Sequence, residues 1–480
     1  MTGWLEATTR LVNTVDDIVW GIPLIAAILA TGVMLSILLR FRHLLHLGSA
    51  FRYVFHPGQG HHGEVTAFGA LCTALSATIG TGNIVGVATA ITTGGPGALF
   101  WMEVAALFGM ATKYAEGLLA VKYREVAPDG RILGGPFYYI ERGLGLRWRP
   151  LAVTFAVCGM LAGLLGIGTI TQIHGIASAV QRFFDPAFNP ADPTTGVTVL
   201  GSTYSLSVMV AGAAVTACVG LVVIGGLKRI AKVSMVVVPF MAISYTAVCL
   251  LVMLGNLEKI PGAVCLIVKA AFDPAAVTGG AVGTLFMAMQ KGIARGIFSN
   301  EAGLGSEPIA AAAKTNEPAR QGFVSMTGTF IDTTVICTMT GLTIVLSGAW
   351  DPALKLEGVN VTIEAFARGL SFLPGCAAIV PFFLMTALAF FAFTTSLGWD
   401  YYSEKCLEYL VGMHRPHIVK AYRLLYVSVV AIGPYLTVSV VWGIADIFNG
   451  LMAFPNLVAL VLLSPVVART TRDFLARQDA

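Results

Sequence analysis

The sequence predicts an all-α membrane protein of about 11 transmembrane helices. Apolar residues make up 56% of the 480 residues and charged residues only 12%, whereas a soluble domain carries roughly a quarter charged residues. The apolar residues also gather in runs long enough to cross a bilayer, for which about 20 residues are needed. Because these runs show no alternation with a period of two, we expect helices and not barrel strands.

Eleven runs satisfy the length requirement. We expect the first to remain in the mature protein, because the N-terminus lacks the basic start of a signal peptide and the run is too long for one. The runs cover residues 18–40, 66–92, 97–123, 150–181, 204–226, 231–254, 280–312, 319–349, 374–399, 419–440 and 443–467.

The distribution of lysine and arginine orients these runs. With the N-terminus outside, about twenty-one basic residues fall in the inner loops and the C-terminal tail, and six fall outside. Because cytoplasmic loops carry the excess of positive charge, we expect the N-terminus outside and the C-terminus in the cytoplasm.

The order of the runs predicts two related halves within a single transmembrane domain, 1–480. After one additional N-terminal helix, 18–40, the blocks 66–254 and 280–467 have similar lengths. Five helices are an odd number, so the second block is inverted relative to the first. Each block opens with an interrupted run: TIGTGN at 78–83 and GIARGIFSNEAGLG at 292–305. Paired interruptions in inverted halves indicate a transporter's central site; glycines used only for helix packing are the alternative.

The first interruption has groups suited to two ligands. Glycine unwinds a helix at little steric cost, and an unwound stretch frees N–H groups on one side and C=O groups on the other. Free N–H groups at the positive end of a half-helix suit a carboxylate, and free carbonyls suit a sodium ion. One broken helix can therefore hold an amino acid and a cation together.

Polar side chains within other runs are further candidates. Gln172 lies in the middle of the fourth run, where a pocket and a simple helix–helix hydrogen bond are both consistent with its type. Thr394, Thr395 and Ser396 form a hydroxyl cluster in the ninth run. Trp399 follows Thr395 by one helical turn and shares its face, either as the cover of a small pocket or as part of an interfacial aromatic belt.

Charged residues within the runs are expected to face the interior of the bundle. Lys113 and Glu116 lie three residues apart and should pair. Arg295 is expected to neutralise Glu301 and Asp332 near the second interruption or to form a gate with them. The full set is Glu103, Lys113, Glu116, Lys291, Arg295, Glu301 and Asp332.

Several function classes find little support. The eight cysteines lie mostly in apolar runs without a CxxC pair, which is typical of small buried residues. No HExxH, GxSxG or P-loop motif occurs, and no basic patch suggests nucleic acid. An uncoupled ion or solute channel and an intramembrane enzyme stay as alternatives. A channel, however, requires polar residues along its whole length, whereas here they converge at one depth.

Four stretches resemble the alanine or glycine:cation symporter family. They follow in order along nearly the whole chain: TALSATIGTGNIVGVATAITTGGPG at 73–97, GGPFYY at 134–139, ARGIFSNEAGLGSEP at 294–308 and FTTSLGWDYY at 393–402. The resemblance implies the leucine-transporter type of fold, a 5+5 inverted repeat of helices 2–6 and 7–11 preceded by one additional helix. It also implies sodium-coupled symport of small neutral amino acids such as alanine and glycine across a bacterial inner membrane, with sodium as coupling ion and no cofactor.

The resemblance further implies site residues. It leaves open which of Thr394, Thr395 and Ser396 holds the cation. The implied substrate-binding residues are Gly80, Thr81, Gly82, Asn83, Gln172, Thr395 and Trp399. The implied sodium-binding residues are Ser76, Ile79, Thr394 and Thr395.

Overall fold

The computed structural model describes residues 2–56, 63–127, 131–189, 192, 196–199, 202–273, 285–306, 308–412, 415–435 and 438–478. These residues are mostly helical, with two short antiparallel hairpins. One hairpin joins β1 (Glu125–Val126) to β2 (Ile132–Leu133), and the other joins β3 (Val197–Val199) to β4 (Ser202–Tyr204). The predicted all-α membrane class is confirmed.

The helices of the first half follow the predicted runs, with shorter helices at the surface. In chain order they are α1 (Thr2–Val19), α2 (Ile22–Leu38), α3 (Arg42–Leu45), α4 (Leu47–Phe55), α5 (Ala67–Thr78), the π-helical η1 (Gly82–Gly86), α6 (Val87–Gly94), α7 (Gly97–Lys122), α8 (Pro136–Leu144), the 3-10 turn η2 (Leu146–Trp148), α9 (Arg149–Leu165), α10 (Ile170–Phe184), α11 (Leu206–Val223) and α12 (Leu227–Leu254).

The second half adds a second series of helices. In chain order they are η4 (Leu257–Lys259), α13 (Ile260–Phe272), α15 (Leu285–Asn300), η5 (Pro308–Ala312), α16 (Pro318–Thr329), the π-helical η6 (Phe330–Cys337), α17 (Thr338–Ser347), η7 (Pro352–Leu354), α18 (Val359–Gly369), α19 (Cys376–Val411), α20 (Pro416–Ile432), η8 (Gly433–Tyr435) and α21 (Val438–Gln478).

Nine helical stretches among the described residues are long and apolar enough to cross a membrane, and the bent pair of α5 and α6 makes a tenth. They correspond to ten of the eleven predicted runs. The exception is the run 280–312: residues 280–284 lie outside the described residues, and α15 has only 16 residues. The total of eleven spans stays a prediction.

Some helix boundaries differ from the prediction because charged residues interrupt the apolar runs. The chain is already helical from Thr2, and α1 is separated from α2 at Trp20 and Gly21, just before Pro23 in the first turn of α2. Helix α19 continues to Val411 and not to residue 399. Its additional turns bury Lys405 and Glu408, whose charged groups pair at 2.8 Å.

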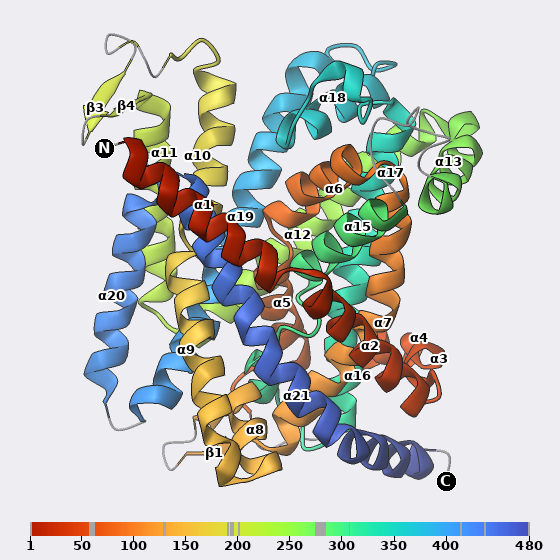
Figure 1. Cartoon of the computed structure of the whole chain (residues 1–480), viewed down its shortest axis with the longest axis vertical. Helices are drawn as coiled ribbons and strands as arrows, with labels where there is room; N and C mark the ends of the chain where they lie inside the picture. Colours follow the sequence, from red (N-terminus) through yellow and green to blue (C-terminus); the bar gives the residue numbers. More distant parts are fainter. Residues whose placement is uncertain are drawn as a thin grey trace.

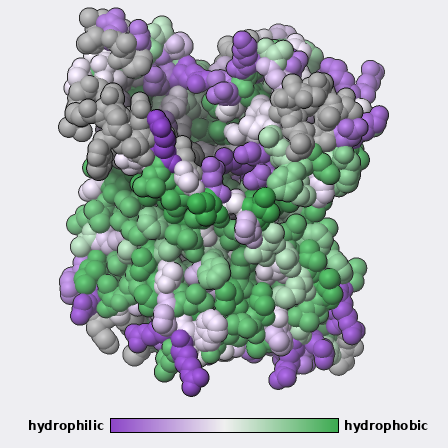
Figure 2. Space-filling model, in the orientation of Figure 1, coloured by the Kyte–Doolittle hydropathy of each residue, from purple (hydrophilic) through white to green (hydrophobic). Residues whose placement is uncertain are grey.

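The helices form one bundle with two distinct ends (Figure 1). The β3–β4 hairpin, α13 and α18 lie at one end, and α8, β1 and the C-terminus lie at the other. Apolar residues cover the surface between the ends, which carry most of the hydrophilic side chains (Figure 2). This distribution is the one that a bilayer requires of an integral membrane protein.

Glycines allow the inner helices to approach closely. A Cβ atom at Gly322 of α16 would lie 2.7 Å from the carbonyl oxygen of Tyr114 in α7. A Cβ atom at Gly32 of α2 would lie 2.8 Å from the carbonyl oxygen of Phe108, also in α7. Such small-residue contacts are characteristic of helix packing in membranes, and here they bring α2 and α16 close to α7.

Candidate functional site

The first interruption is a short, sharp break between α5 and η1. Helix α5 ends at Thr78, Ile79 is extended, and the axis turns by 54° before the next helix. The predicted break at 78–83 is thus confirmed, but it is narrower than expected, since Thr81 already has right-handed helical dihedrals and η1 begins at Gly82. Thr81 and Gly82 therefore open a new helix, whose first N–H groups have no partner within that helix.

Three predicted site residues, one in the break itself and two from α10 and α19, meet here. A Cβ atom at Gly80 would lie 2.6 Å from Thr395 Oγ1 of α19 and 3.6 Å from Gln172 Oε1 of α10. Thr395 Oγ1 also lies 3.3 Å from the Ile79 carbonyl oxygen. The buried Gln172 Oε1 has no hydrogen-bond partner within the described part of the chain, so the simple helix–helix hydrogen bond is not formed in this structure.

Asn83 has a different environment from Gln172. Its Oδ1 accepts a hydrogen bond from the Gly80 N–H at 2.8 Å. Its Nδ2 donates to Asp332 Oδ1 of η6 at 2.7 Å and to Ser299 Oγ of α15 at 3.0 Å. Asn83 therefore links the first broken helix to the second half of the chain and shapes the loop around Gly80.

The candidate sodium ligands divide into two groups. Thr395 and Ile79 face each other, as described above, although the Thr395 hydroxyl also lies 3.0 Å from the Phe391 carbonyl oxygen of its own helix. Ser76 Oγ donates to the Thr73 carbonyl within its own helix, at 2.7 Å. Thr394 Oγ1 bonds to carbonyl oxygens of its own helix at 3.0 Å and lies 3.5 Å from Met241 Sδ of α12. Of the two threonine hydroxyls, only Thr395 is within hydrogen-bond distance of the Ile79 carbonyl in this structure.

Trp399 is buried, with an exposed fraction of 1%. Its indole Nε1 donates to Glu301 Oε1 at 2.9 Å, and a Cβ atom at Gly168, between α9 and α10, would lie 2.6 Å from Trp399 Cβ. This burial excludes the interfacial aromatic belt. Trp399 instead connects α19 to the second broken helix.

The second interruption lies later than predicted. Residues 292–300 are helical within α15, and the break covers 301–306 before η5. Glu301 and Gly303 have positive φ angles of 56° and 91°. Glu116 Oε1 of α7 accepts from the N–H groups of Gly303 and Gly305, at 3.1 and 3.2 Å, and from Asn456 Nδ2 of α21 at 2.7 Å. Neighbouring helices thus bind the freed N–H groups of this break.

The charge pairing is partly as predicted. Lys113 Nζ lies 3.9 Å from Glu116 Oε2, which confirms that pair. The expectation that Arg295 neutralises Glu301 and Asp332 is wrong: Lys113 is the cation that acts on both carboxyl groups. Arg295 lies elsewhere, with its guanidinium carbon 5.6 Å from the centroid of the Phe298 ring. Arg295 lies within α15, whereas Glu301 lies just beyond the end of this helix with a positive φ angle.

A cavity of about 260 Å³ leads to the first break. Thr81 and Gly82 line its inner part, together with Thr171 and His174 of α10 and with Phe298 of α15. The Phe298 ring carbon Cδ1 would lie 3.7 Å from a Cβ atom at Gly82. The sequence analysis missed Phe298, because an aromatic residue in an apolar run is ordinarily a packing residue; its place three residues after Arg295 in an interrupted helix was the available signal.

Known proteins were compared with this chain. The family model described as the sodium:alanine symporter family matches residues 5–480. An uncharacterized transporter of Haemophilus influenzae is 50% identical to this chain, and the alignment covers 97% of this chain and 96% of the transporter. The sodium/alanine symporter AgcS of Methanococcus maripaludis is 43% identical, with the same two coverages.

A solved structure supports the fold independently. MhsT in complex with L-phenylalanine superposes with a TM-score of 0.56, covering 86% of this chain and 99% of that one, at 14% sequence identity. MhsT has the leucine-transporter fold, so the implied leucine-transporter type of fold is confirmed, whereas the 5+5 inverted repeat with its boundaries stays a prediction. The family and the fold are those of transporters, not of enzymes. The chain belongs to the sodium:alanine symporter family and is a multi-pass membrane protein that couples amino-acid transport to sodium.

Proposed function

We propose that this protein imports small neutral amino acids, alanine and glycine foremost, together with sodium. It would lie in a bacterial inner membrane with its N-terminus outside and its C-terminus in the cytoplasm. The proposal rests chiefly on the meeting of Gly80, Gln172 and Thr395 at the first helix break.

The substrate's charged groups match the polar groups at this break. The carboxylate would bind at Gly80, Thr81 and Gly82, where a helix begins and its dipole is positive, after the Gly80 N–H group turns from Asn83 Oδ1 to the substrate. The ammonium group would donate to Gln172 Oε1, a buried acceptor that lacks a partner in the described structure. A zwitterion thereby satisfies both sides of the break, which an apolar solute or a simple anion does not.

Sodium would bind beside the amino acid. The Ile79 carbonyl and the Thr395 hydroxyl supply oxygen atoms on facing elements, and hard cations prefer oxygen ligands. Ser76 and Thr394 complete the proposed set, after their hydroxyls reorient from carbonyls of their own helices. Coupling follows because the same break, through Ile79 and Gly80, contributes to both sites.

The size of the substrate would be limited by steric exclusion. Gly80 lies close to Thr395, and Trp399 follows Thr395 by one turn in α19. A methyl group contributes only about 1 kcal/mol on burial, so preference for alanine over larger residues must come from a lack of space.

Contacts at the two ends of the bundle support an outward-facing arrangement in an alternating-access cycle. A cavity reaches Thr81 and Gly82 from one side. On the other side, the N–H group of Glu64 donates to the Ala312 carbonyl at 2.8 Å, and Arg124 donates to the Ala311 carbonyl at 2.7 Å. Transport would exchange these states by moving the proposed repeats, 66–254 and 280–467, relative to one another.

Uptake of labelled alanine into proteoliposomes tests the proposal. We expect accumulation only with an inward sodium gradient, and a stronger one with a negative interior, because one charge crossing 100 mV gains about 2.3 kcal/mol. Uptake that is independent of sodium would contradict it.

Competition by leucine and methionine tests the size limit. We expect both to compete weakly in the wild type and more strongly in Trp399→Ala, in which space opens near the substrate. A matched control is Trp101→Ala, since Trp101 donates to the Ala271 carbonyl away from the break. If wild-type protein takes up leucine as readily as alanine, the size argument is wrong.

A further inference from the structure

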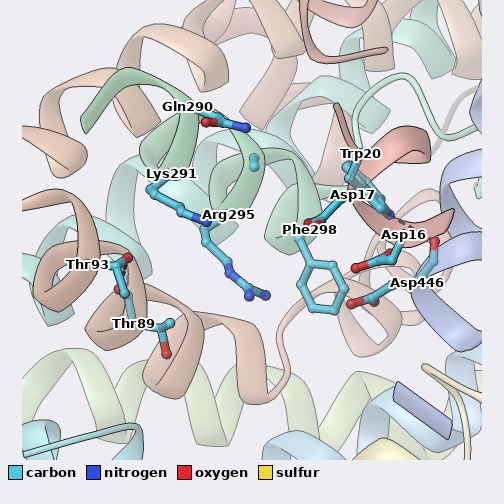
Figure 3. Close-up of a pocket in the computed structure, with 11 residues that line it drawn as sticks. Asp16, Asp17, Trp20, Thr89, Thr93, Gln290, Lys291, Arg295, Phe298 and Asp446 are labelled. Carbon is cyan, nitrogen blue, oxygen red and sulfur yellow. Dashed lines mark hydrogen bonds between the residues drawn. The ribbon is translucent and has the colours of Figure 1, made fainter. Parts of the chain in front are cut away.

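A second cavity lies outside the central site and has walls of opposite charge. Its volume is about 180 Å³. Thr89, Arg295 and Phe298 line both this cavity and the one that reaches Thr81 and Gly82, so the two cavities adjoin at these residues. Its remaining lining side chains come chiefly from α1, α15 and α21 (Figure 3).

The acidic wall is formed by the additional N-terminal helix together with α21. Asp16 of α1 and Asp446 of α21 lie close to each other on one side of the cavity (Figure 3). Trp20 Nε1 donates to the Asp446 carbonyl oxygen at 2.8 Å and holds α1 against α21. The Asp16 Oδ1 atom is buried and has no hydrogen-bond partner in the described residues.

The basic wall is formed by α15. The Arg295 and Lys291 side chains lie across the cavity from the two carboxyl groups, and the Phe298 ring lies between Arg295 and Asp446 in Figure 3. Arg295 attracts both Asp16 and Asp446 electrostatically. The walls thus have complementary charges, and no direct ion pair between Arg295 and either carboxylate occurs within the described structure at 4.0 Å or less.

A zwitterion fits this arrangement better than a single charge does. An isolated cation near Asp16 is repelled by Arg295 and Lys291, and an isolated anion near Arg295 is repelled by Asp16 and Asp446. An amino acid presents an ammonium group to one wall and a carboxylate to the other. Its ammonium group can donate a hydrogen bond to Asp16 Oδ1, which otherwise has no donor among the described residues.

We propose that this cavity is an outer binding site for the amino-acid substrate. Its ammonium group binds at Asp16 and Asp446, and its carboxylate binds at Arg295. The site captures the substrate before it passes Phe298 to the break at Gly80. It rests on the proposed function, and it assigns a substrate-binding role to the additional N-terminal helix.

Initial uptake rates at varied external alanine test the role of each wall. We expect Asp16→Asn and Arg295→Gln to raise the half-saturating alanine concentration by about two- to fivefold, the size of effect that one partly exposed charge contact has, with the maximal rate retained. Glu357→Gln and Lys355→Gln are matched controls, because these exposed residues do not line the cavity. A variant series indistinguishable from its controls, or one that changes the maximal rate alone, overturns the proposal.

Direct binding separates the outer site from the central one. A Cβ atom at Gly80 would lie 2.6 Å from Thr395 Oγ1, so Gly80→Ala should obstruct the central site. In this variant, purified in sodium, we expect labelled alanine to bind weakly at one site, and Asp16→Asn added to it to abolish that binding. Absence of binding in a folded Gly80→Ala protein contradicts an outer site. Wild-type protein that fails to take up alanine contradicts the proposed function instead.

Discussion

Both broken helices are interrupted by glycine-rich segments, but the surrounding protein treats their freed polar groups differently. At the first break, Gln172 Oε1 has no partner among the described residues, and Thr395 lies beside the Ile79 carbonyl. At the second break, Glu116 accepts from the N–H groups of Gly303 and Gly305. Similar interruptions in the sequence therefore have different consequences: the first has polar groups available to a ligand, and the second is bound to its neighbours.

The difference originates in residues that are distant from the second break along the chain but contact it in the fold. Glu116 lies on α7 and Asn456 on α21, and together they bind the N–H groups of the second break and the Gly303 carbonyl. Trp399 adds a further contact through Glu301. These ties indicate that the second break is a fixed structural joint in this state, whereas the first is the proposed binding element.

Removal of Glu116 should have the largest effect. Glu116→Ala leaves the N–H groups of Gly303 and Gly305 without their acceptor and leaves the buried Lys113 without its paired carboxylate. We expect a loss of about 3–5 kcal/mol of stability, as for other broken buried ion pairs. Thermal unfolding followed by size-exclusion chromatography in detergent measures it. Glu103→Gln, on the same helix, is the control; equal unfolding temperatures for the two variants would mean that the second break is not held by Glu116.

Asn83→Ala should reduce both stability and transport. The substitution removes the acceptor of the Gly80 N–H group and the Nδ2 group that donates to Asp332 and Ser299. A buried group without its partner costs roughly 1–3 kcal/mol, and more when it is charged, so we expect a lowered unfolding temperature as well as slower alanine uptake. Loss of uptake at unchanged stability would instead favour direct contact between Asn83 and the substrate.

Gln172→Ala should affect transport alone. The Gln172 Oε1 atom makes no hydrogen bond in the described structure, so its removal breaks no contact of that atom within the protein. A hydrogen bond to a charged ammonium group contributes about 1.5–3 kcal/mol, and we therefore expect alanine affinity to fall by roughly tenfold or more. Titration of alanine into purified protein measures this fall, and an unchanged affinity at an unchanged unfolding temperature removes Gln172 from the site.

The two threonines should differ in their effect on sodium. Valine retains the shape of threonine but lacks its oxygen. Thr395 faces the Ile79 carbonyl, whereas Thr394 lies against Met241. We expect Thr395→Val to raise the half-saturating sodium concentration by about three- to tenfold, and Thr394→Val to raise it less. The reverse order in sodium-dependent uptake would place the cation on the other face of α19.

Several features were predictable because they depend on composition and local spacing. The apolar runs predicted ten spans that the structure contains, and the glycines at 80 and 82 predicted the break after α5. Lys113 and Glu116 were paired correctly because a separation of three residues places two side chains on the same helix face. Gly80, Gln172 and Thr395 were identified as site residues, and the fold brings them together.

Other features were decided by contacts between distant segments. The sequence placed Arg295 with Glu301 because they are close in the chain, but a helical residue's direction changes by about 100° per residue, and Arg295 faces Phe298 and the outer cavity. Charged residues interrupt the apolar run of α1. The sequence therefore did not predict that α1 packs against α21.

The sequence by itself determined that this protein lies in a lipid bilayer and that two of its helices are interrupted, the first of them at the predicted residues. Both depend on the average polarity of a run and on the local freedom of glycine. The tertiary structure decided which interruption retains polar groups for a ligand. That choice depends on whether a buried acceptor such as Glu116, nearly two hundred positions away in the chain, reaches the freed N–H groups; a buried polar group must find a partner wherever the fold supplies one.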